Sequence, residues 1–197
     1  MKHVFALIAI FLMLQQGKVF TQEKSRGIIP DCINLQFAGN IGSLSLGLGY
    51  YLNPGKNLQL DAVYGYSPPY RTGKAIHNLV ARLKYNPRGI KMSENLWLNP
   101  YTAFAISRQI ADEDRTFERL PKNFPEGYYA PNAFRLHLDL GASLHKKFNP
   151  DNVIRGIEYY IATTTNELYV QYFFNSRKVH PGDIFSLTMG INLILFE

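Results

Sequence analysis

The C-terminal segment from Ile184 to Phe196 alternates between apolar side chains and small or polar ones. The apolar set is Phe185, Leu187, Met189, Ile191, Leu193 and Leu195, and the other set is Ser186, Thr188, Gly190 and Asn192. Because successive side chains of a β-strand point to opposite faces, this pattern predicts a strand with one apolar face. The segment is also long enough for the roughly nine to eleven residues that a tilted strand needs to cross a bilayer. It therefore favours a transmembrane β-barrel.

The N-terminus has the layout of a secretory signal peptide. A short basic start precedes an apolar run from Val4 to Leu14, which is too short for a membrane-spanning helix. Cleavage is expected near Thr21–Gln22, with Gly17–Lys18 as an alternative position. We therefore divide the chain into a signal peptide, residues 1–21, and a single exported domain, residues 22–197.

The composition agrees with a strand-rich protein and excludes some partners. The chain has 13 Tyr and 13 Phe, and aromatic residues suit both strands and the interfacial girdles of a membrane barrel. No run of Lys and Arg resembles a nucleic-acid patch, so no nucleic acid is expected as a partner. Cys32 is the only cysteine, which rules out an internal disulfide framework.

Seven further alternating segments, separated by turn residues, precede the C-terminal one. They are Ile33–Phe37, Ser43–Tyr50, Leu58–Ser67, Ile76–Tyr85, Leu96–Ser107, Phe134–His145 and Ile154–Thr163. With the final strand the count is eight, the smallest even number among single-chain outer-membrane barrels. Leu168–Phe174 alternates only in part and is left open as a separate strand, a hairpin arm above the membrane or a short helix in a loop.

The connecting segments fall into a short set and a long set. The first comprises 53–57, 86–94 and 146–153, and the second comprises 67–75, 108–132 and 164–183. This difference is expected between periplasmic turns and extracellular loops. The link at 39–42 is an exception, because it is short although it lies on the same side of the barrel as the long set. The loop at 108–132 mixes charges of both signs and is where we expect an extracellular partner, whose identity the sequence does not give.

The faces opposite the apolar ones carry charged residues that would lie in the barrel lumen. These are Asp61, Arg82, Lys84, Arg135, His137, Asp139 and Glu158. An isolated buried charge is very unfavourable, so these groups must pair or be hydrated. We predict a plug of salt bridges and hydrogen bonds in a lumen too narrow for an open pore. The alternative is a proton- or ligand-responsive cluster around Arg135, His137 and Asp139.

Alternation alone does not say which face points outward. A soluble barrel would turn its leucine face inward and bind a ligand there. The polar faces here are rich in Gly and Ser, which suits a narrow filled lumen better than a solvated wall. Tyr50, Tyr66 and Tyr85 also lie near predicted strand ends, where a headgroup girdle would place them. These features favour the membrane orientation.

Three segments, Gly39–Tyr50, Leu60–Tyr66 and Ile76-His77, resemble the small eight-stranded outer-membrane barrels of Bacteroidota, which mostly have no assigned activity. The resemblance covers most of the mature chain. It implies an all-β, antiparallel up-and-down barrel in the cell outer membrane, with outer-membrane lipid and lipopolysaccharide as partners. The final strand is similar to the C-terminal signal read by the outer-membrane insertion machinery, and the matching residues are Thr188, Gly190, Leu193 and Leu195. Here Glu197 follows Phe196, whereas that signal commonly ends on the aromatic residue.

The sequence predicts no catalytic residue, no cofactor and no metal site. A lipid A-modifying enzyme, of deacylase or acyltransferase type, would need a His–Ser pair with an acidic partner near the outer rim. His77, Ser67 and His137 are available, but no local motif joins them. Metal-ligand spacing is absent beyond His137-x-Asp139. We therefore predict an outer-membrane barrel with a structural or interaction role. A lipid A-modifying enzyme is the first alternative and a soluble periplasmic ligand-binding barrel is the second.

Overall fold

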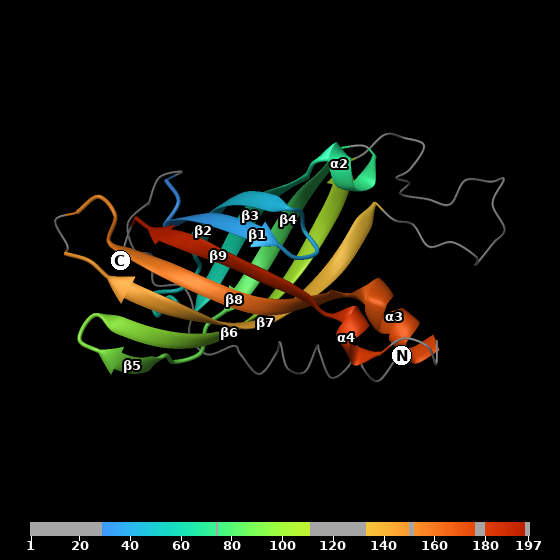
Figure 1. Ribbon diagram of the computed structural model, residues 1–197. Coiled ribbons are helices and arrows are strands. Elements are labelled where there is room, and N and C mark those ends of the chain that lie inside the picture. The colour runs from blue at the N-terminus through green and yellow to red at the C-terminus, as the bar shows by residue number, and fades with distance from the viewer. Residues whose placement is uncertain (1–28, 74, 111–132, 150–151, 176–179, 196–197) are drawn as a thin grey trace.

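The computed structural model describes residues 29–73, 75–110, 133–149, 152–175 and 180–195 of the 197-residue chain. The expected signal peptide and residues 111–132 of the expected extracellular loop lie outside these described residues. The described part is all-β and antiparallel, with a closed barrel of eight strands (Figure 1).

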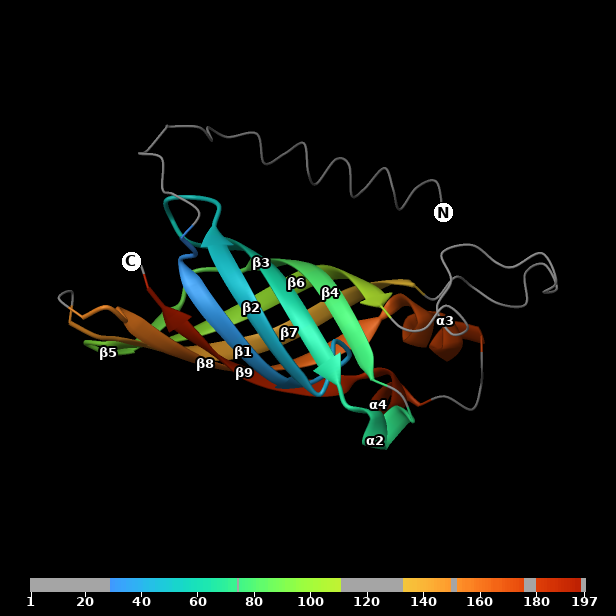
Figure 2. The same cartoon turned by 90° about the horizontal axis from the view of Figure 1, so that it is seen from above.

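The strands follow the chain in an up-and-down order. Their bounds are β1 Cys32–Ala38, β2 Leu44–Tyr51, β3 Leu58–Ser67, β4 Ile76–Tyr85, β5 Ile90–Ser93, β6 Leu96–Ile110, β7 Phe134–Lys147, β8 Gly156–Asn166 and β9 Ser186–Ile194. The barrel closes because β4 pairs with β6 and β1 pairs with β9. The short β5 pairs only with β6, so it forms a hairpin that extends beyond the barrel wall. The strong tilt of the strands is visible in Figure 2.

The two ends of the barrel differ in their connections. One end, which we call the helix end, carries α2 (Pro69–Thr72), α3 (Glu167–Asn175) and α4 (Pro181–Ile184) (Figure 1). The other, which we call the hairpin end, carries the β5–β6 hairpin, the turn between β2 and β3 and the link between β7 and β8. None of the helices in the described part of the chain is long and apolar enough to span a membrane.

The strands β3 and β4 agree at both ends with the expectation from alternation, and β1 and β2 differ from it by one residue at each end. The strand β7 ends two residues later than expected, and β8 begins two residues later and ends three residues later. The expectation is also wrong in three other places. Residues 108–110 continue β6 instead of starting a loop, because β6 keeps its pairing with β4 as far as Ile110. Residues 90–93, expected within a turn, form β5. Ile184 ends α4, so the last strand begins only at Ser186.

The segment Leu168–Phe174, left open by the sequence, lies within α3. The Asn166 side chain accepts a hydrogen bond from the Tyr169 backbone N–H at 2.9 Å, which stabilises the first turn of this helix. The Glu167 carboxylate accepts a hydrogen bond from the Leu136 backbone N–H at 2.8 Å. The helix is therefore attached to the rim of the barrel beside β7.

The apolar faces of the strands point outward. Along β7, Leu136, Leu138 and Leu140 are 43%, 45% and 52% exposed, whereas the alternate residues His137 and Asp139 are each 3% exposed. A soluble ligand-binding barrel requires the leucine face to line the interior. That alternative is wrong in its orientation, since the structure places charged and amide side chains inside and leucines outside.

A cluster of buried apolar side chains lies in the lumen toward the helix end. The short link between β1 and β2 folds into the barrel, with Ile41 only 2% exposed and packed in a cluster with Val63, Val80 and Ala105. The Ile41 carbonyl oxygen lies 2.5 Å from the place where a Cβ on Gly65 would be, so only glycine leaves room for this link. Val63, which departs from the polar alternation of β3, is therefore a packing partner of the folded-in link.

Candidate functional site

The lumen contains a buried ion pair between two neighbouring strands. Asp61 on β3 and Arg82 on β4 face each other across the sheet, and two guanidinium nitrogens lie 2.8 and 2.9 Å from Asp61 Oδ2. The second carboxylate oxygen of Asp61 accepts a hydrogen bond from Gln59 at 2.5 Å. Arg82 Nη1 donates to the Gln36 Oε1 atom of β1 at 2.8 Å. The charges of both partners are thus satisfied inside the wall.

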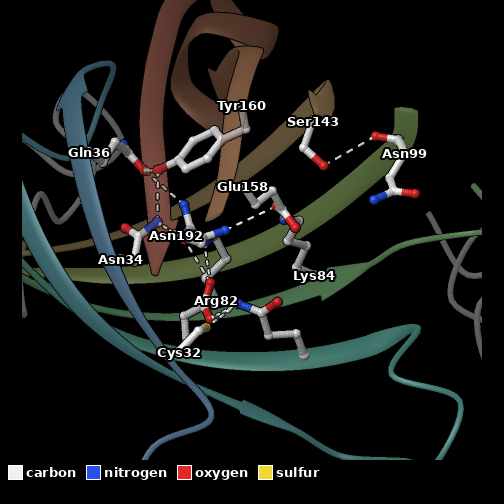
Figure 3. A network of polar contacts seen from close by, with 12 residues as sticks. Cys32, Asn34, Gln36, Arg82, Lys84, Asn99, Ser143, Glu158, Tyr160 and Asn192 are labelled. Atoms are coloured by element: carbon white, nitrogen blue, oxygen red, sulfur yellow. Dashed lines mark hydrogen bonds and ion pairs between the residues drawn. The ribbon is translucent and has the colours of Figure 1, made fainter. Parts of the chain in front are cut away.

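A second ion pair spans the lumen from β4 to β8. Lys84 Nζ lies 2.5 Å from Glu158 Oε1, and the Asn192 amide of β9 donates to the same oxygen at 3.0 Å (Figure 3). The Lys84 ammonium also lies 4.4 Å from the centre of the Tyr101 ring and 5.7 Å from that of Tyr160. An ammonium group over an aromatic face is attracted by the ring, so Lys84 has both a carboxylate and two rings around it.

Uncharged residues that the sequence reasoning did not include join these pairs into one network. Asn34 Nδ2 donates to Asn192 Oδ1 at 2.6 Å and to the Tyr160 hydroxyl at 3.0 Å. That hydroxyl in turn donates to Gln36 Oε1 at 3.1 Å (Figure 3). The alternation of the sequence already places these residues on the polar faces of their strands, but the predicted lumen cluster was built around the charged residues of those faces.

The network fills the barrel interior with side chains from five strands, β1, β3, β4, β8 and β9. Gln59, Asp61, Arg82, Lys84 and Glu158 are all at most 4% exposed. Groups buried this deeply are stable only when hydrogen-bonded, and such networks fix one arrangement of the surrounding elements. The arrangement is that of a structural plug that bridges opposite walls.

In the predicted cluster of Arg135, His137 and Asp139, the arginine and the histidine contact residues outside the cluster. Arg135 lies at the helix end, where its guanidinium is 3.3 Å from the Glu167 carboxylate of α3. His137 Nε2 instead lies 2.7 Å from the Ser107 hydroxyl oxygen of β6. In the part of the chain that the structure describes, His137 Nδ1 and Asp139 Oδ1 have no hydrogen-bond partner. The Ser107 contact was not foreseen, because it depends on the register between β6 and β7.

The other residues considered for catalysis have separate partners. His77 lies on the outer wall, with Nδ1 2.5 Å from the Tyr64 hydroxyl, and Ser67 Oγ accepts a hydrogen bond from the Ser43 backbone N–H at 3.3 Å. Ser107 and His137 form the one Ser–His contact within the described ranges, and they are only 4% and 3% exposed. Among these same residues, no group of three His, Cys, Asp or Glu side chains is placed to hold a metal ion.

The residues of the insertion-signal resemblance lie on both faces of the last strand. Thr188 and Gly190 point inward, and a Cβ on Gly190 would lie 2.4 Å from the Tyr160 hydroxyl oxygen. Leu193 lies on the outward face of β9. The Leu195 backbone N–H donates to the Asp31 carbonyl at 2.8 Å, which joins the end of the chain to the start of β1.

Comparisons of the chain with protein families, with curated proteins and with solved structures find no match.

Proposed function

We propose that the mature chain is an integral outer-membrane β-barrel with a closed polar lumen, and that its role is structural or interaction-based. One observation carries this proposal: the barrel has its apolar side chains outside and its charges inside. Each of the eight strands contributes large apolar side chains that are at least 40% exposed, and the examples are Leu35, Leu46, Leu60, Leu79, Phe104, Leu138, Ile161 and Met189. A water-soluble monomer rarely exposes apolar patches of more than a few hundred Å².

The closed barrel itself supports a bilayer environment. Every strand of the barrel has hydrogen-bonded neighbours on both sides, so no sheet edge is left open along the wall. Backbone groups that face hydrocarbon must be satisfied internally, and closed barrels are one of the two structures that achieve this. The same wall in water would expose a continuous apolar band around the molecule.

Aromatic residues near both ends of the strands support the same environment. Toward the helix end, the His77 ring centre lies 5.3 Å from that of Tyr66 and 5.9 Å from that of Tyr64 on the outer wall. Toward the hairpin end, Tyr85 is 46% exposed. Two aromatic girdles at the interfaces are typical of outer-membrane barrels. Because its turns are shorter, we assign the hairpin end to the periplasm and the helix end to the cell exterior.

A substitution on the outer wall tests this proposal. We expect Leu138→Arg to impair insertion, because an arginine near the bilayer midplane costs about 2–4 kcal/mol. Phe134→Arg is the matched control: it lies on the same face of β7 at the strand end, where the expected cost is about 0–1 kcal/mol. The readouts are fractionation of the cells and the change in gel mobility on heating that folded barrels show.

The wild-type protein and the Phe134→Arg variant are expected in the outer-membrane fraction, where both should show the change in mobility on heating. The Leu138→Arg variant is expected to be depleted from this fraction. Normal insertion of Leu138→Arg would contradict the orientation of the wall. A wild-type protein recovered as a single band from the soluble periplasmic fraction would contradict the membrane location.

A lipid A-modifying activity is the second candidate, and one contact favours it. A serine hydroxyl held by a histidine nitrogen at 2.7 Å is the arrangement that activates a nucleophile for acyl transfer. The Ser107 and His137 side chains are nevertheless almost completely buried, and no carboxylate is hydrogen-bonded to the second nitrogen of His137 in the described residues. The structural role is therefore favoured.

A further inference from the structure

A cavity of about 510 Å³ lies at the hairpin end of the barrel. It is lined by the end of β2, the turn between β2 and β3, the link before β5, and strands β6, β7 and β8. The lining side chains that matter most are Tyr51, Lys56, Arg88, Trp97, Lys147 and Glu158. Its size is that of an ordinary small-molecule site, since such sites occupy roughly 300–1,000 Å³.

The formal charge of the lining is positive. Lys56, Arg88 and Lys147 contribute three cations, and Glu158 is the acidic side chain among the described lining residues. Glu158 is bonded at 2.5 Å to Lys84, which lies deeper in the lumen, so its charge is already balanced. A partly enclosed site lined by one sign of charge concentrates ions of the opposite sign.

Aromatic rings hold lysine ammonium groups around this cavity. Lys56 Nζ lies 5.5 Å from the Tyr51 ring centre, and Lys147 Nζ lies 5.1 Å from the Trp97 ring centre. Lys91 of β5 adds a third ammonium, 6.0 Å from the same indole. A ring attracts an ammonium group through its quadrupole but carries no net charge, so the ring positions the cation without neutralising it.

We propose that this cavity binds a small ligand through an oxyanion, either a carboxylate or a phosphate group. Lysine and arginine donate charge-assisted hydrogen bonds to both groups, and these bonds are about twice as strong as neutral ones. Arg88 offers a planar fork that fits two oxygens at once. The amide-bearing residues Asn57, Asn86 and Asn99 also line the cavity and supply neutral polar groups for the rest of the ligand. This binding function is additional to the structural role and does not depend on it.

The chain offers a direct probe of the site, because Trp97 is its only tryptophan. The full-length protein, purified in detergent, is titrated separately with inorganic phosphate and with citrate while the Trp97 fluorescence is recorded. The expected result is a saturable change with at least one of the two anions, and none with sodium chloride at equal ionic strength. Isothermal titration calorimetry gives the dissociation constant independently of the fluorophore.

Two neighbouring lysines provide a matched pair of variants. Lys147 lines the cavity, whereas Lys146 points to the opposite face of β7 and is exposed. Lys147→Gln is expected to weaken binding about tenfold, which corresponds to the loss of one charge-assisted contact. Lys146→Gln makes the same change of charge and should leave the dissociation constant unchanged.

Arg88 lies in the link between β4 and β5, outside any strand, so Arg88→Gln gives a second test if Lys147→Gln does not fold. Arg88→Gln should also weaken anion binding. A preference for phosphate or for citrate would assign the ligand to the phosphate-bearing or the carboxylate-bearing class. The proposal is overturned if neither anion gives a saturable response, if chloride reproduces the response, or if Lys146→Gln weakens binding as much as Lys147→Gln.

Discussion

Replacing Lys84 by methionine is expected to destabilise the barrel by about 3–5 kcal/mol. Lys84 and Glu158 are 3% and 4% exposed, and their ion pair spans the lumen. Methionine keeps most of the length of lysine but removes its charge. The Glu158 carboxylate would then retain the Asn192 amide, at 3.0 Å, as a hydrogen-bond donor. Removing one partner of a buried ion pair leaves an uncompensated charge, and losses of about this size are typical.

The converse substitution should be less harmful. Glu158→Gln leaves the Lys84 ammonium without its carboxylate, but the rings of Tyr101 and Tyr160 remain at 4.4 and 5.7 Å. A desolvated cation–π contact contributes about 2 kcal/mol, so the expected loss is reduced to about 1–3 kcal/mol. The double variant removes both charges together, and its stability should lie within about 1 kcal/mol of the wild type.

These free energies can be measured by urea unfolding and refolding in phospholipid vesicles, with the fluorescence of Trp97 as the signal. Lys146→Met is the control, because it removes an exposed lysine and should change stability by no more than about 0.5 kcal/mol. The reasoning is refuted if Lys84→Met loses less than about 1 kcal/mol. It is also refuted if the double variant is as unstable as the sum of the two single ones.

Two further substitutions test close contacts in the lumen. Gly190→Ala places a Cβ 2.4 Å from the Tyr160 hydroxyl and 2.5 Å from the Leu35 carbonyl oxygen, so it should cost about 1–3 kcal/mol in the same unfolding assay. Gly182→Ala, whose Cβ meets nothing within 4 Å, is its control, and equal stability of both variants would contradict the expected clash. Ser107→Ala should leave the lipid A of expressing cells unchanged by mass spectrometry, because Ser107 is 4% exposed. A modification made by the wild type and lost in this variant would instead establish an acyl-transfer role.

The strands could be predicted because the alternation of side chains is a local property with period two. The predicted strand Leu96–Ser107 corresponds to β6, which is the longest strand in the described structure, at 15 residues. Pro100 interrupts its pattern but does not break the strand. On one edge, β6 pairs with β5 up to Leu98 and with β4 from Thr102, so Pro100 lies in the gap between these pairings. Its missing N–H therefore removes no ladder hydrogen bond on that edge.

The contacts of the lumen could be predicted only in part. Alternation was enough to place Asp61 and Arg82 on polar faces, but their pairing requires the register of β3 against β4. The partners Lys84 and Glu158 are 74 residues apart, and no local pattern links them. The start of α3 did have a local signal, since Asn166 followed by Glu167 is a common way to begin a helix. The link that carries Ile41 folds into the barrel because Gly65 leaves space for it, and no local sequence pattern predicts this contact.

Glu158 connects the plug of the lumen to the cavity at the hairpin end. Its carboxylate is bonded to Lys84 on the lumen side, and the same residue lines the cavity. Lys84→Met would leave the negative charge of Glu158 uncompensated at the cavity wall, and this charge would oppose anion binding. Glu158→Gln would remove that negative charge and would therefore favour anion binding. Both substitutions destabilise the barrel, yet they change the electrostatic potential of the cavity in opposite directions. Any loss of affinity that merely followed from loss of stability would have the same sign in both variants, so this pair separates a binding site from a structural cavity.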